Sequence, residues 1–263
     1  MNTQPIGIFD SGIGGLSIWK EITSLLPHEA TIYLADSANA PYGEKSKDEI
    51  IQLCIKNTEK LIALGCKLIV VACNTATTNA IEILRKNYAI SFIGIEPAIK
   101  PAGLKSSTKS IGILATKGTL NSRLFSETAR KYLHGITIVE KIGKGLVPLI
   151  ETNQMYSDKM NTLLERYIHP MLQENIDCLV LGCTHYPFLI PQIKKITGPT
   201  IKIIDSGRAV AKQTKAVLIL ENMITPAEHI SQTHKIYSNT DLNTIENILQ
   251  DTPTTFILIK ESF

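Results

Sequence analysis

Short apolar runs alternate with longer stretches of helical spacing along most of the chain. In segments 47–64 and 157–174 the apolar residues recur about every 3.6 positions, which predicts helices. Between such stretches, runs rich in Val, Ile and Leu predict strands at 5–9, 31–35, 67–72, 91–95, 110–114, 136–140, 177–182 and 200–204. Near-continuous apolar strands separated by helices are typical of parallel sheets covered on both faces. The predicted fold class is therefore α/β with mainly parallel sheets.

Three stretches of the sequence are echoed later in the chain. "IGIFDSGIGGL" at 6–16 resembles "IGILATKGTL" at 111–120, and "LIVVACNT" at 68–75 resembles "CLVLGCTH" at 178–185. "GIEPA" is more loosely echoed by "IIDSG", and the three echoes keep the same order at a nearly constant offset. A repeat of this kind indicates duplication of a structural unit. We therefore expect two similar α/β lobes related by pseudo-two-fold symmetry, with an active site in the cleft between them.

The repeat also predicts where the lobes begin and end. The second lobe is expected at 97–207, and the first at 1–96 together with 208–263. The C-terminal segment "HKIYSNTDLNTIENILQDTPTTFILIK" has no counterpart in the first half. It is therefore expected to add the last helices and strand to the first lobe.

Composition and charge exclude several classes of protein. The chain has 263 residues, is 44% hydrophobic and carries a net charge of +3. Its lysines are scattered and do not alternate with aromatic residues, so no nucleic-acid partner is expected. No apolar run approaches the roughly 20 residues that cross a bilayer, and no membrane association is expected. Because "MNTQPIGIFD" leads straight into a predicted strand without a basic, apolar leader, we expect a cytoplasmic protein.

The five cysteines argue against a disulfide framework. Their number is odd and no two of them form a Cys-x-x-Cys pair, which also argues against a cysteine zinc site. No metal is expected. Cys54, Cys66 and Cys178 lie in or next to apolar segments and are interpreted as small core residues. Cys73 and Cys183 remain to be explained.

Polar residues gather where the predicted strands end, which is where ligands bind in open α/β sheets. They are Asp10 and Ser11 before the turn "GIGG", Asp36 before "PYG" at 41–43, Cys73, Asn74 and Thr75, then Thr116 and Thr119, Glu151, and finally Cys183, Thr184 and His185. Simpler interpretations stay open: Ser11 and Thr116 as helix caps, Glu151 as a surface charge, and His185 as a structural residue. The turn does not fit the G-x-G-x-x-G fingerprint, so dinucleotide binding is not expected.

The two remaining cysteines occupy matching positions in the repeat. Each ends an apolar strand, follows a small residue (Ala72 or Gly182) that lets a ligand approach, and precedes a predicted helix start. Helix N-terminal N–H groups stabilise a thiolate and favour bound carboxylates. Two thiols facing one another suit inversion at the Cα of an amino acid, with a base on one face and an acid on the other. Because the Cα–H is a weak acid, Asp10 and His185 are natural assistants, and no electron-sink cofactor is needed in principle.

These motifs resemble those of the glutamate racemases, in the cofactor-independent aspartate/glutamate racemase superfamily. The resemblance is carried by "IGIFDSGIGGL", "ADSANAPYGEKS", "VACNTATTNAI", "GIEPA", "GILATKGTL", "LVPLIE" and "VLGCTHYPFL", in order, from residue 6 to about 207. Related aspartate racemases share the two thiols but typically lack the His-Tyr-Pro after the second. The resemblance therefore favours glutamate, with aspartate or a related amino acid as the alternative substrate.

The resemblance implies roles for individual residues. Cys73 would deprotonate D-glutamate and Cys183 L-glutamate, assisted by Asp10, Asp36, Glu151 and His185. Substrate contacts would come from Asp10, Ser11, Tyr42, Gly43, Asn74, Thr75, Thr116, Thr119, Thr184 and His185. It further implies a homodimer without cofactor that supplies D-glutamate for peptidoglycan, and hence for cell-wall biogenesis and cell shape. Only Met1 to Gln4 precede the predicted strand 5–9, so regulation through an N-terminal extension is not expected.

Three other functions are compatible with parts of the pattern. A single-thiol amidohydrolase could pair Cys183 with His185, but it leaves Cys73 unexplained, and side chains that leave a strand close together generally point apart. A two-lobed protein that binds a small dicarboxylate without turnover needs neither thiol. A redox pair is weaker still, because thiols on opposite sides of a substrate lie too far apart to bond.

Overall fold

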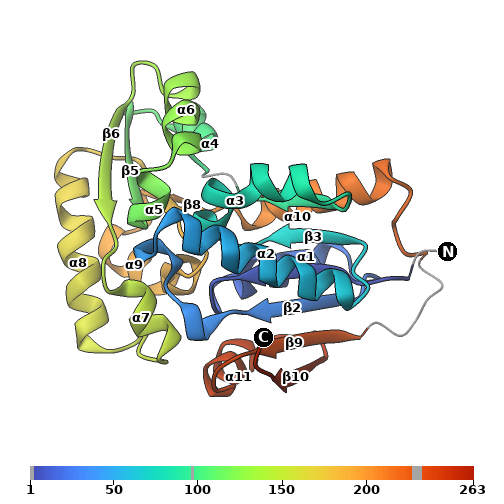
Figure 1. Cartoon of the computed structure of the whole chain (residues 1–263). Helices are drawn as coiled ribbons and strands as arrows, with labels where there is room; N and C mark the ends of the chain where they lie inside the picture. The colour runs from blue at the N-terminus through green and yellow to red at the C-terminus, as the bar shows by residue number, and fades with distance from the viewer. Residues whose placement is uncertain (1–2, 96–97, 227–232) are drawn as a thin grey trace. The chain divides into compact units, whose positions relative to one another are not determined.

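The computed structural model describes residues 3–95, 98–226 and 233–263, and it divides the chain into two units. The first unit consists of Met1–Ile95 with Gly207–Phe263, and the second of Glu96–Ser206. The boundaries predicted from the repeat differ from these by one residue. All eight predicted strands are present, with ends shifted by at most two residues, and the α/β fold class is confirmed (Figure 1).

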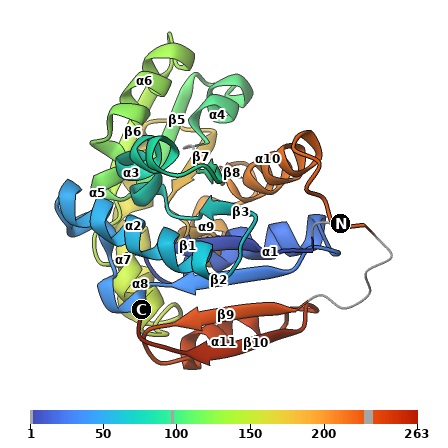
Figure 2. The ribbon, with the colours of Figure 1, turned by 45° about the vertical axis from the view of Figure 1, so that its right-hand side comes forward.

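The first unit is built on a six-stranded parallel sheet. Its strands are β1 (Ile6–Asp10), β2 (Thr31–Ala35), β3 (Leu68–Val71), β4 (Ser91–Gly94), β9 (His234–Ser238) and β10 (Phe256–Lys260). Their order is β10-β9-β2-β1-β3-β4, and every neighbouring pair is parallel. Figure 2 shows β9 and β10 extending the sheet beyond β2.

The expectation for the C-terminal segment was incomplete. Among its described residues there are two strands, β9 and β10, on either side of the helix α11 (Asn243–Leu249). "HKIYS" was not recognised as a strand because His234 and Lys235 interrupt its apolar pattern. His234 is nevertheless buried, because a hydrogen bond satisfies its ring.

Two pairs of helices cover this sheet. α1 (Leu16–Leu25) packs on α10 (Gly207–Leu220), and α2 (Lys47–Ala63) packs on α3 (Asn74–Asn87). Because crossovers between parallel strands are right-handed, α1 lies on one face and α2 with α3 on the other. Two short turns, η1 (Ser37–Asn39) and η2 (Tyr42–Glu44), connect β2 to α2. Within the described part of the chain, no helix combines the length and apolarity needed to cross a bilayer.

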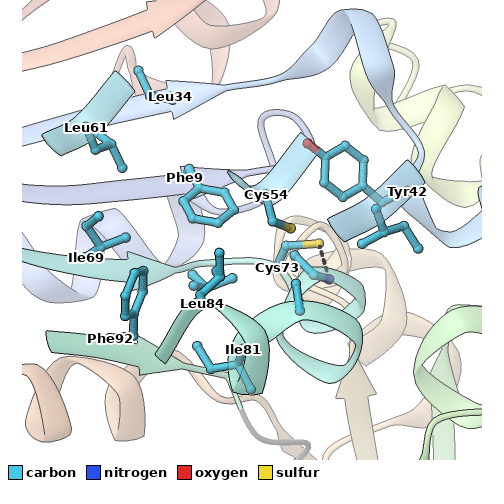
Figure 3. Packing of buried hydrophobic residues seen from close by; sticks show 14 of the residues in the cluster. Phe9, Leu34, Tyr42, Cys54, Leu61, Ile69, Cys73, Ile81, Leu84 and Phe92 are labelled. Atoms are coloured by element: carbon cyan, nitrogen blue, oxygen red, sulfur yellow. Dashed lines mark hydrogen bonds between the residues drawn. The ribbon is translucent and has the colours of Figure 1, made fainter. Parts of the chain in front are cut away.

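The core of the first unit lies between the sheet and the α2–α3 pair (Figure 3). Phe9, Leu34 and Leu61 are fully buried there. Burial of one such side chain contributes about 1.5–3 kcal/mol. Cys54 and Cys66 are buried in the same cluster, as their apolar surroundings predicted. Burial raises the pKa of the Cys66 thiol to about 12, and it also raises the pKa of Cys54, so both remain thiols at neutral pH.

The second unit is a four-stranded parallel sheet covered by helices. Its strands are β5 (Ser110–Ala115), β6 (Thr137–Ile142), β7 (Cys178–Gly182) and β8 (Lys202–Ile204), in the order β6-β5-β7-β8. The helices are α4 (Ile99–Lys105), α5 (Lys117–Leu120), α6 (Arg123–Tyr132), α7 (Leu146–Glu151), α8 (Asp158–Gln173) and α9 (Ile190–Thr197), with the turn η3 (Tyr186–Leu189) between β7 and α9. α4 packs on α6, and α8 packs on α9.

The two sheets share one connectivity. In the first unit β1 lies between β2 and β3, with β4 beyond β3, and in the second unit β5 lies between β6 and β7, with β8 beyond β7. The echoed motifs therefore occupy the same strands of the same topology, β1 and β5 for the first motif, β3 and β7 for the second. The pseudo-two-fold relation between the units stays a prediction.

A buried ion pair anchors the segment that follows α10. Lys67 Nζ lies 2.7 Å from Glu29 Oε2, and both side chains are 1% exposed. The Glu29 carboxylate also accepts hydrogen bonds from the N–H and hydroxyl of Thr225, at 2.7 and 2.9 Å. Lys67 donates to the Met223 carbonyl at 2.7 Å. The pair thus joins the residues before β2 and β3 to the C-terminal half of the unit.

Lys67→Met is expected to lower the free energy of unfolding of the first unit by about 3–5 kcal/mol, because it leaves the Glu29 charge buried. Urea unfolding followed by the emission of Trp19, the chain's one tryptophan, measures this loss. The exposed pair of Arg208 and Glu21, 3.5 Å apart, supplies the control. Arg208→Met should cost less than about 1 kcal/mol. Equal losses of unfolding free energy in the two variants would show that the buried Lys67–Glu29 pair is no more important than the exposed pair.

A second polar contact inside the first unit involves a histidine. Thr31 Oγ1 accepts a hydrogen bond from the indole N–H of Trp19 at 2.8 Å and lies 2.8 Å from His234 Nδ1. The direction of this hydrogen bond depends on the tautomer of the imidazole. Burial lowers the pKa of His234 from its ordinary value of 6.5. Below that pH the unfolded chain therefore binds a proton that the folded chain does not.

The stability of the first unit is consequently expected to fall as the pH drops below about 6.5, down to the lowered pKa of His234. Urea midpoints read from Trp19 emission should decline between about pH 7 and about pH 5.5. His234→Phe should flatten this decline, whereas Gln at the exposed His28 should not. An unchanged pH dependence in His234→Phe would show that other groups cause it.

Candidate functional site

The ladder between β1 and β3 brings a thiol next to a hydroxyl. It continues past the end of β3, where the Ala72 N–H donates to the Phe9 carbonyl at 2.7 Å. Just beyond, Cys73 Sγ lies 3.7 Å from Ser11 Oγ, and Ser11 Oγ lies 3.3 Å from Asp10 Oδ1. All three side chains are buried. The first unit thus holds a thiol–hydroxyl–carboxylate chain at the carboxyl end of its sheet.

Cys73 also occupies the N-cap position of α3. Its sulfur accepts the Ala76 N–H at 3.4 Å, the contact dashed in Figure 3. This N–H and the positive end of the helix dipole stabilise a thiolate over a thiol. Asn74 and Thr75 open the helix and are each 3% exposed. Asn74 Nδ2 has no hydrogen-bond partner among the described residues. A buried donor left in this way costs about 1–3 kcal/mol, so it points to a ligand.

The glycine turn after β1 holds the Asp10 carboxylate. The N–H of Gly15 donates to Asp10 Oδ2 at 2.7 Å, and Gly15 is the N-cap of α1. A Cβ on Gly15 would lie 2.8 Å from Asp10 Cβ and 2.9 Å from Ala72 Cβ, so only glycine allows this approach. The helix-cap interpretation of Ser11 is therefore wrong. The turn binds the chain's own carboxylate at the helix start.

Asp36 and Tyr42 contact each other. Asp36 follows β2, and the Tyr42 hydroxyl donates to its Oδ2 at 2.5 Å. Tyr42 is 1% exposed, and burial together with the neighbouring Asp36 raises the pKa of its hydroxyl. The Tyr42 hydroxyl is therefore committed to partners inside the first unit. Sequence reasoning missed the other groups that bind this carboxylate, Asn39, Asn57 and Asn239.

In the second unit a thiol, an imidazole and a carboxylate form a chain. Cys183 Sγ lies 3.7 Å from His185 Nδ1, and His185 Nε2 lies 2.5 Å from Glu151 Oε1. Cys183 is 6% exposed and His185 1%. The surface-charge interpretation of Glu151 and the purely structural interpretation of His185 do not account for this chain of contacts.

The approach of His185 to Cys183 corrects an expectation. Side chains leaving a strand were expected to point apart, but the chain turns after β7, and His185 has helical backbone angles of φ −74° and ψ −31°. The turn directs the imidazole back toward the sulfur. The geometric objection to a Cys183–His185 pair is therefore wrong.

The electrostatics of His185 favour its charged form. Burial alone would lower its pKa, but the hydrogen bonds to Cys183 and Glu151 outweigh burial and raise the pKa well above 6.5. These hydrogen bonds therefore favour the imidazolium over the neutral imidazole. The ring thus lies between the sulfur of Cys183 and the carboxylate of Glu151.

Tyr186 fixes the segment that leads to Glu151. Its hydroxyl donates to the Gly143 carbonyl at 3.2 Å, and the Gly143 N–H donates to the Ala115 carbonyl of β5 at 3.0 Å. α7 follows directly and ends at Glu151. Burial raises the pKa of Tyr186, so its hydroxyl keeps the proton that it donates. Nothing in the sequence pattern marked Tyr186 and Gly143 as partners.

The remaining predicted residues of the second unit lie around the ends of β5 and β7. Thr116 is the N-cap of α5 and accepts the Thr119 N–H at 3.2 Å, so its helix-cap interpretation is correct. Thr119 and Thr184 are buried. A Cβ on Gly182 would lie 2.6 Å from Ala115 Cβ. Packing between β5 and β7 already requires this glycine, whereas the sequence suggested that a ligand does.

The structure thus places the predicted site residues in two sets. The first unit holds Asp10, Ser11, Asp36, Tyr42, Gly43, Cys73, Asn74 and Thr75, and the second holds Thr116, Thr119, Glu151, Cys183, Thr184 and His185. Cys183 directly follows β7 in the second unit. Cys73 follows β3 in the first unit, with Ala72 between them. Among the described residues, no group of three or more His, Cys, Asp or Glu side chains is placed to hold a metal ion.

Comparison with known proteins relates these two sets to one family. The family model described as Asp/Glu/Hydantoin racemase matches residues 14–214. A glutamate racemase of Herpetosiphon aurantiacus is 44% identical over 226 residues, which cover 86% of this chain and 89% of that protein.

Solved structures agree with the sequence match. A glutamate racemase isoform of Bacillus anthracis has a TM-score of 0.88 at 27% identity, covering 100% of this chain and 99% of that one. A glutamate racemase of Francisella tularensis in complex with D-glutamate has a TM-score of 0.83 at 30% identity, covering 100% of this chain and 98% of that one. The chain therefore belongs to the Asp/Glu/hydantoin racemase family.

Proposed function

We propose that this chain interconverts L-glutamate and D-glutamate by proton transfer between the substrate Cα and two thiols, Cys73 and Cys183. The observation that carries the proposal is that both thiols follow the third strand of the same connectivity, each with its own acid–base partners. The glutamate racemases among its relatives, one of them bound to D-glutamate, support glutamate as the substrate.

The reaction balances within the substrate and the two sulfurs. The Cys73 thiolate takes the α-proton of D-glutamate, and the Cys183 thiol gives its proton to the opposite face of Cα, which yields L-glutamate. One Cα–H bond breaks as one S–H bond forms, and the reverse occurs at the other sulfur. In the opposite direction Cys183 is the base and Cys73 the acid. No electron passes to another group.

In the first unit Asp10 and Ser11 assist Cys73. When Cys73 starts as a thiol, its proton can pass along the hydrogen bond to Ser11 and from there to Asp10, which leaves the thiolate that the reaction needs. The Ala76 N–H and the start of α3 stabilise that thiolate. The free donor of Asn74 at the same helix start fits a substrate carboxylate oxygen.

In the second unit His185 and Glu151 assist Cys183. The protonated imidazole stabilises the Cys183 thiolate, and Glu151 holds the imidazole in place and in its charged state. In the first unit, Asp36 is proposed to assist proton transfer as well, through its hydrogen bond from Tyr42. Substrate contacts from Asp10, Ser11, Tyr42, Gly43, Asn74, Thr75, Thr116, Thr119, Thr184 and His185 stay predictions.

The proposed product suits bacterial cell-wall synthesis, which consumes D-glutamate in peptidoglycan. Cysteines in a reducing compartment remain free thiols, and all five here are free, which supports a cytoplasmic location. The homodimer implied by the family resemblance stays a prediction.

One observation favours a second function. Cys183, His185 and Glu151 are arranged as nucleophile, base and orienting carboxylate, which is the arrangement of single-thiol hydrolases. Such an enzyme has no use for Cys73, although that thiol is built into its own buried chain of contacts. Removal of each thiol in turn therefore separates the two functions.

Alanine at either Cys73 or Cys183 is expected to lower the rate of racemisation by about 10²-fold to 10⁴-fold, because one of the two proton-transfer groups is lost. The measurement is incubation with L-glutamate in D2O without added cofactor, followed by loss of optical activity and deuterium at Cα. Wild-type protein should show both.

Buried cysteines outside the site supply matched controls, one in each unit. Cys66→Ala and Cys178→Ala should racemise glutamate at close to the wild-type rate, because those thiols are buried outside the proposed site. Full racemisation by Cys73→Ala would overturn the two-thiol mechanism. Hydrolysis of an amide that requires Cys183 but not Cys73 would establish the second function instead.

Glu151→Gln is expected to lower kcat/KM by roughly 10-fold to 100-fold, because the imidazolium of His185 loses its charged partner. The pKa of His185 should fall in the variant, so the alkaline limb of the pH profile of kcat/KM should move to lower pH. Glu165→Gln, on the exposed side of α8, is the control and should leave both unchanged. A profile that keeps its alkaline limb would show that Glu151 does not set the charge of His185.

A further inference from the structure

The carboxylate of Asp36 collects hydrogen bonds from three separate segments of the first unit. Its Oδ2 accepts the Tyr42 hydroxyl at 2.5 Å, and its Oδ1 accepts the amides of Asn239 at 2.6 Å and of Asn39 at 2.8 Å. The Asn57 amide lies 3.1 Å from the Tyr42 hydroxyl oxygen. Asp36 is fully buried, so these donors replace the water that would otherwise solvate it.

Asn239 stands out because it comes from the C-terminal segment. It directly follows β9, whose Ser238 pairs with Ala35 at the end of β2. Its side-chain oxygen accepts the Ala38 N–H at 2.8 Å, while its amide donates to Asp36. One half-buried side chain therefore fixes both the carboxylate and the main chain of the turn that begins the connection to Tyr42.

We propose that Asn239 is a positioning residue for substrate binding, which acts through Asp36 on the segment Tyr42–Gly43. The inference rests on the proposed function, in which that segment contacts glutamate. The Tyr42 side chain is committed to Asp36, so the Asp36 carboxylate determines where the main chain of Tyr42–Gly43 lies. Asn239 in turn orients that carboxylate, which makes the C-terminal strand part of the binding machinery.

The size of the effect follows from the chemistry of the contact. A hydrogen bond to a charged group contributes more than one between neutral groups, and a tenfold change in a dissociation constant corresponds to about 1.4 kcal/mol. Asn239 acts at one remove, through Asp36 and Tyr42. Its removal is therefore expected to weaken glutamate binding by roughly tenfold.

The test compares kcat, KM and the dissociation constant of glutamate in wild-type protein and Asn239→Ala. The variant should raise KM for both enantiomers and the dissociation constant about tenfold, with kcat within about twofold of wild type. Alanine at the exposed Asn247, on α11, is the matched control and should change none of them. A loss of stability alone, measured by urea unfolding, would not alter KM in the folded fraction.

If Asn239→Ala disturbs folding, a second set of variants exchanges the Asn239 amide and the Asp36 carboxylate. Asn239→Asp puts a carboxylate against Asp36 and should raise KM at least as much as alanine. The double variant Asp36→Asn/Asn239→Asp restores an amide–carboxylate pair in the opposite sense and should recover part of that loss.

The outcomes separate this proposal from the function on which it rests. Wild-type values of KM and of the dissociation constant in Asn239→Ala, with racemisation by wild-type protein, would overturn the role of Asn239 alone. A fall in kcat at constant KM would overturn that role as well. A wild-type chain that neither binds nor racemises glutamate would overturn both proposals.

Discussion

The pairing of the first and third strands is the constraint on which the position of each thiol within its own unit depends. β1 pairs with β3, and β5 with β7, in parallel and in fixed register. Wherever such a pair ends, the next residues of the two strands leave the sheet side by side. Ser11 meets Cys73 in this way. In the second unit Ala115 pairs with Gly182 in the last rung, so that Thr116 and Cys183 follow it. The backbone thus sets the position of each thiol before any side chain contributes.

The same frame carries different chemistry in the two units. Cys73 is linked through the Ser11 hydroxyl to Asp10 and accepts a helix N–H. Cys183 instead faces an imidazole whose pKa is raised by its hydrogen bonds to Cys183 and Glu151. A duplicated backbone therefore does not make the two thiols equivalent. The carboxylate in each thiol's chain of contacts is bound within the same unit, Asp10 by the Gly15 N–H and Glu151 by the His185 ring. The contacts around each thiol are thereby preorganised within its own unit.

The sequence predicted the strands and the strand-end residues because both leave a local signal. Apolar runs marked β3 and β7, and Cys73 and Cys183 stood at their ends. Contacts between distant segments leave no such signal. Asn239 lies beyond a strand whose pattern His234 interrupts, and Tyr186 reaches Gly143 through a turn that periodicity does not describe. Gly182 was recognised, but its reason was not, because the Ala115 methyl that excludes a side chain belongs to a neighbouring strand.

The difference between the two thiols also has to be consistent with the thermodynamics of racemisation. L-glutamate and D-glutamate have the same free energy in water, so kcat/KM must be equal in the two directions whatever groups assist each thiol. Because Cys73 and Cys183 have different partners, kcat and KM can each differ between the two enantiomers. Only their ratio, kcat/KM, has to be the same. Tight binding of one enantiomer must be matched by its slower turnover. Under the proposed two-thiol mechanism, a change at Glu151, which contacts His185 beside one thiol, is consequently expected to alter kcat/KM for both enantiomers by the same factor.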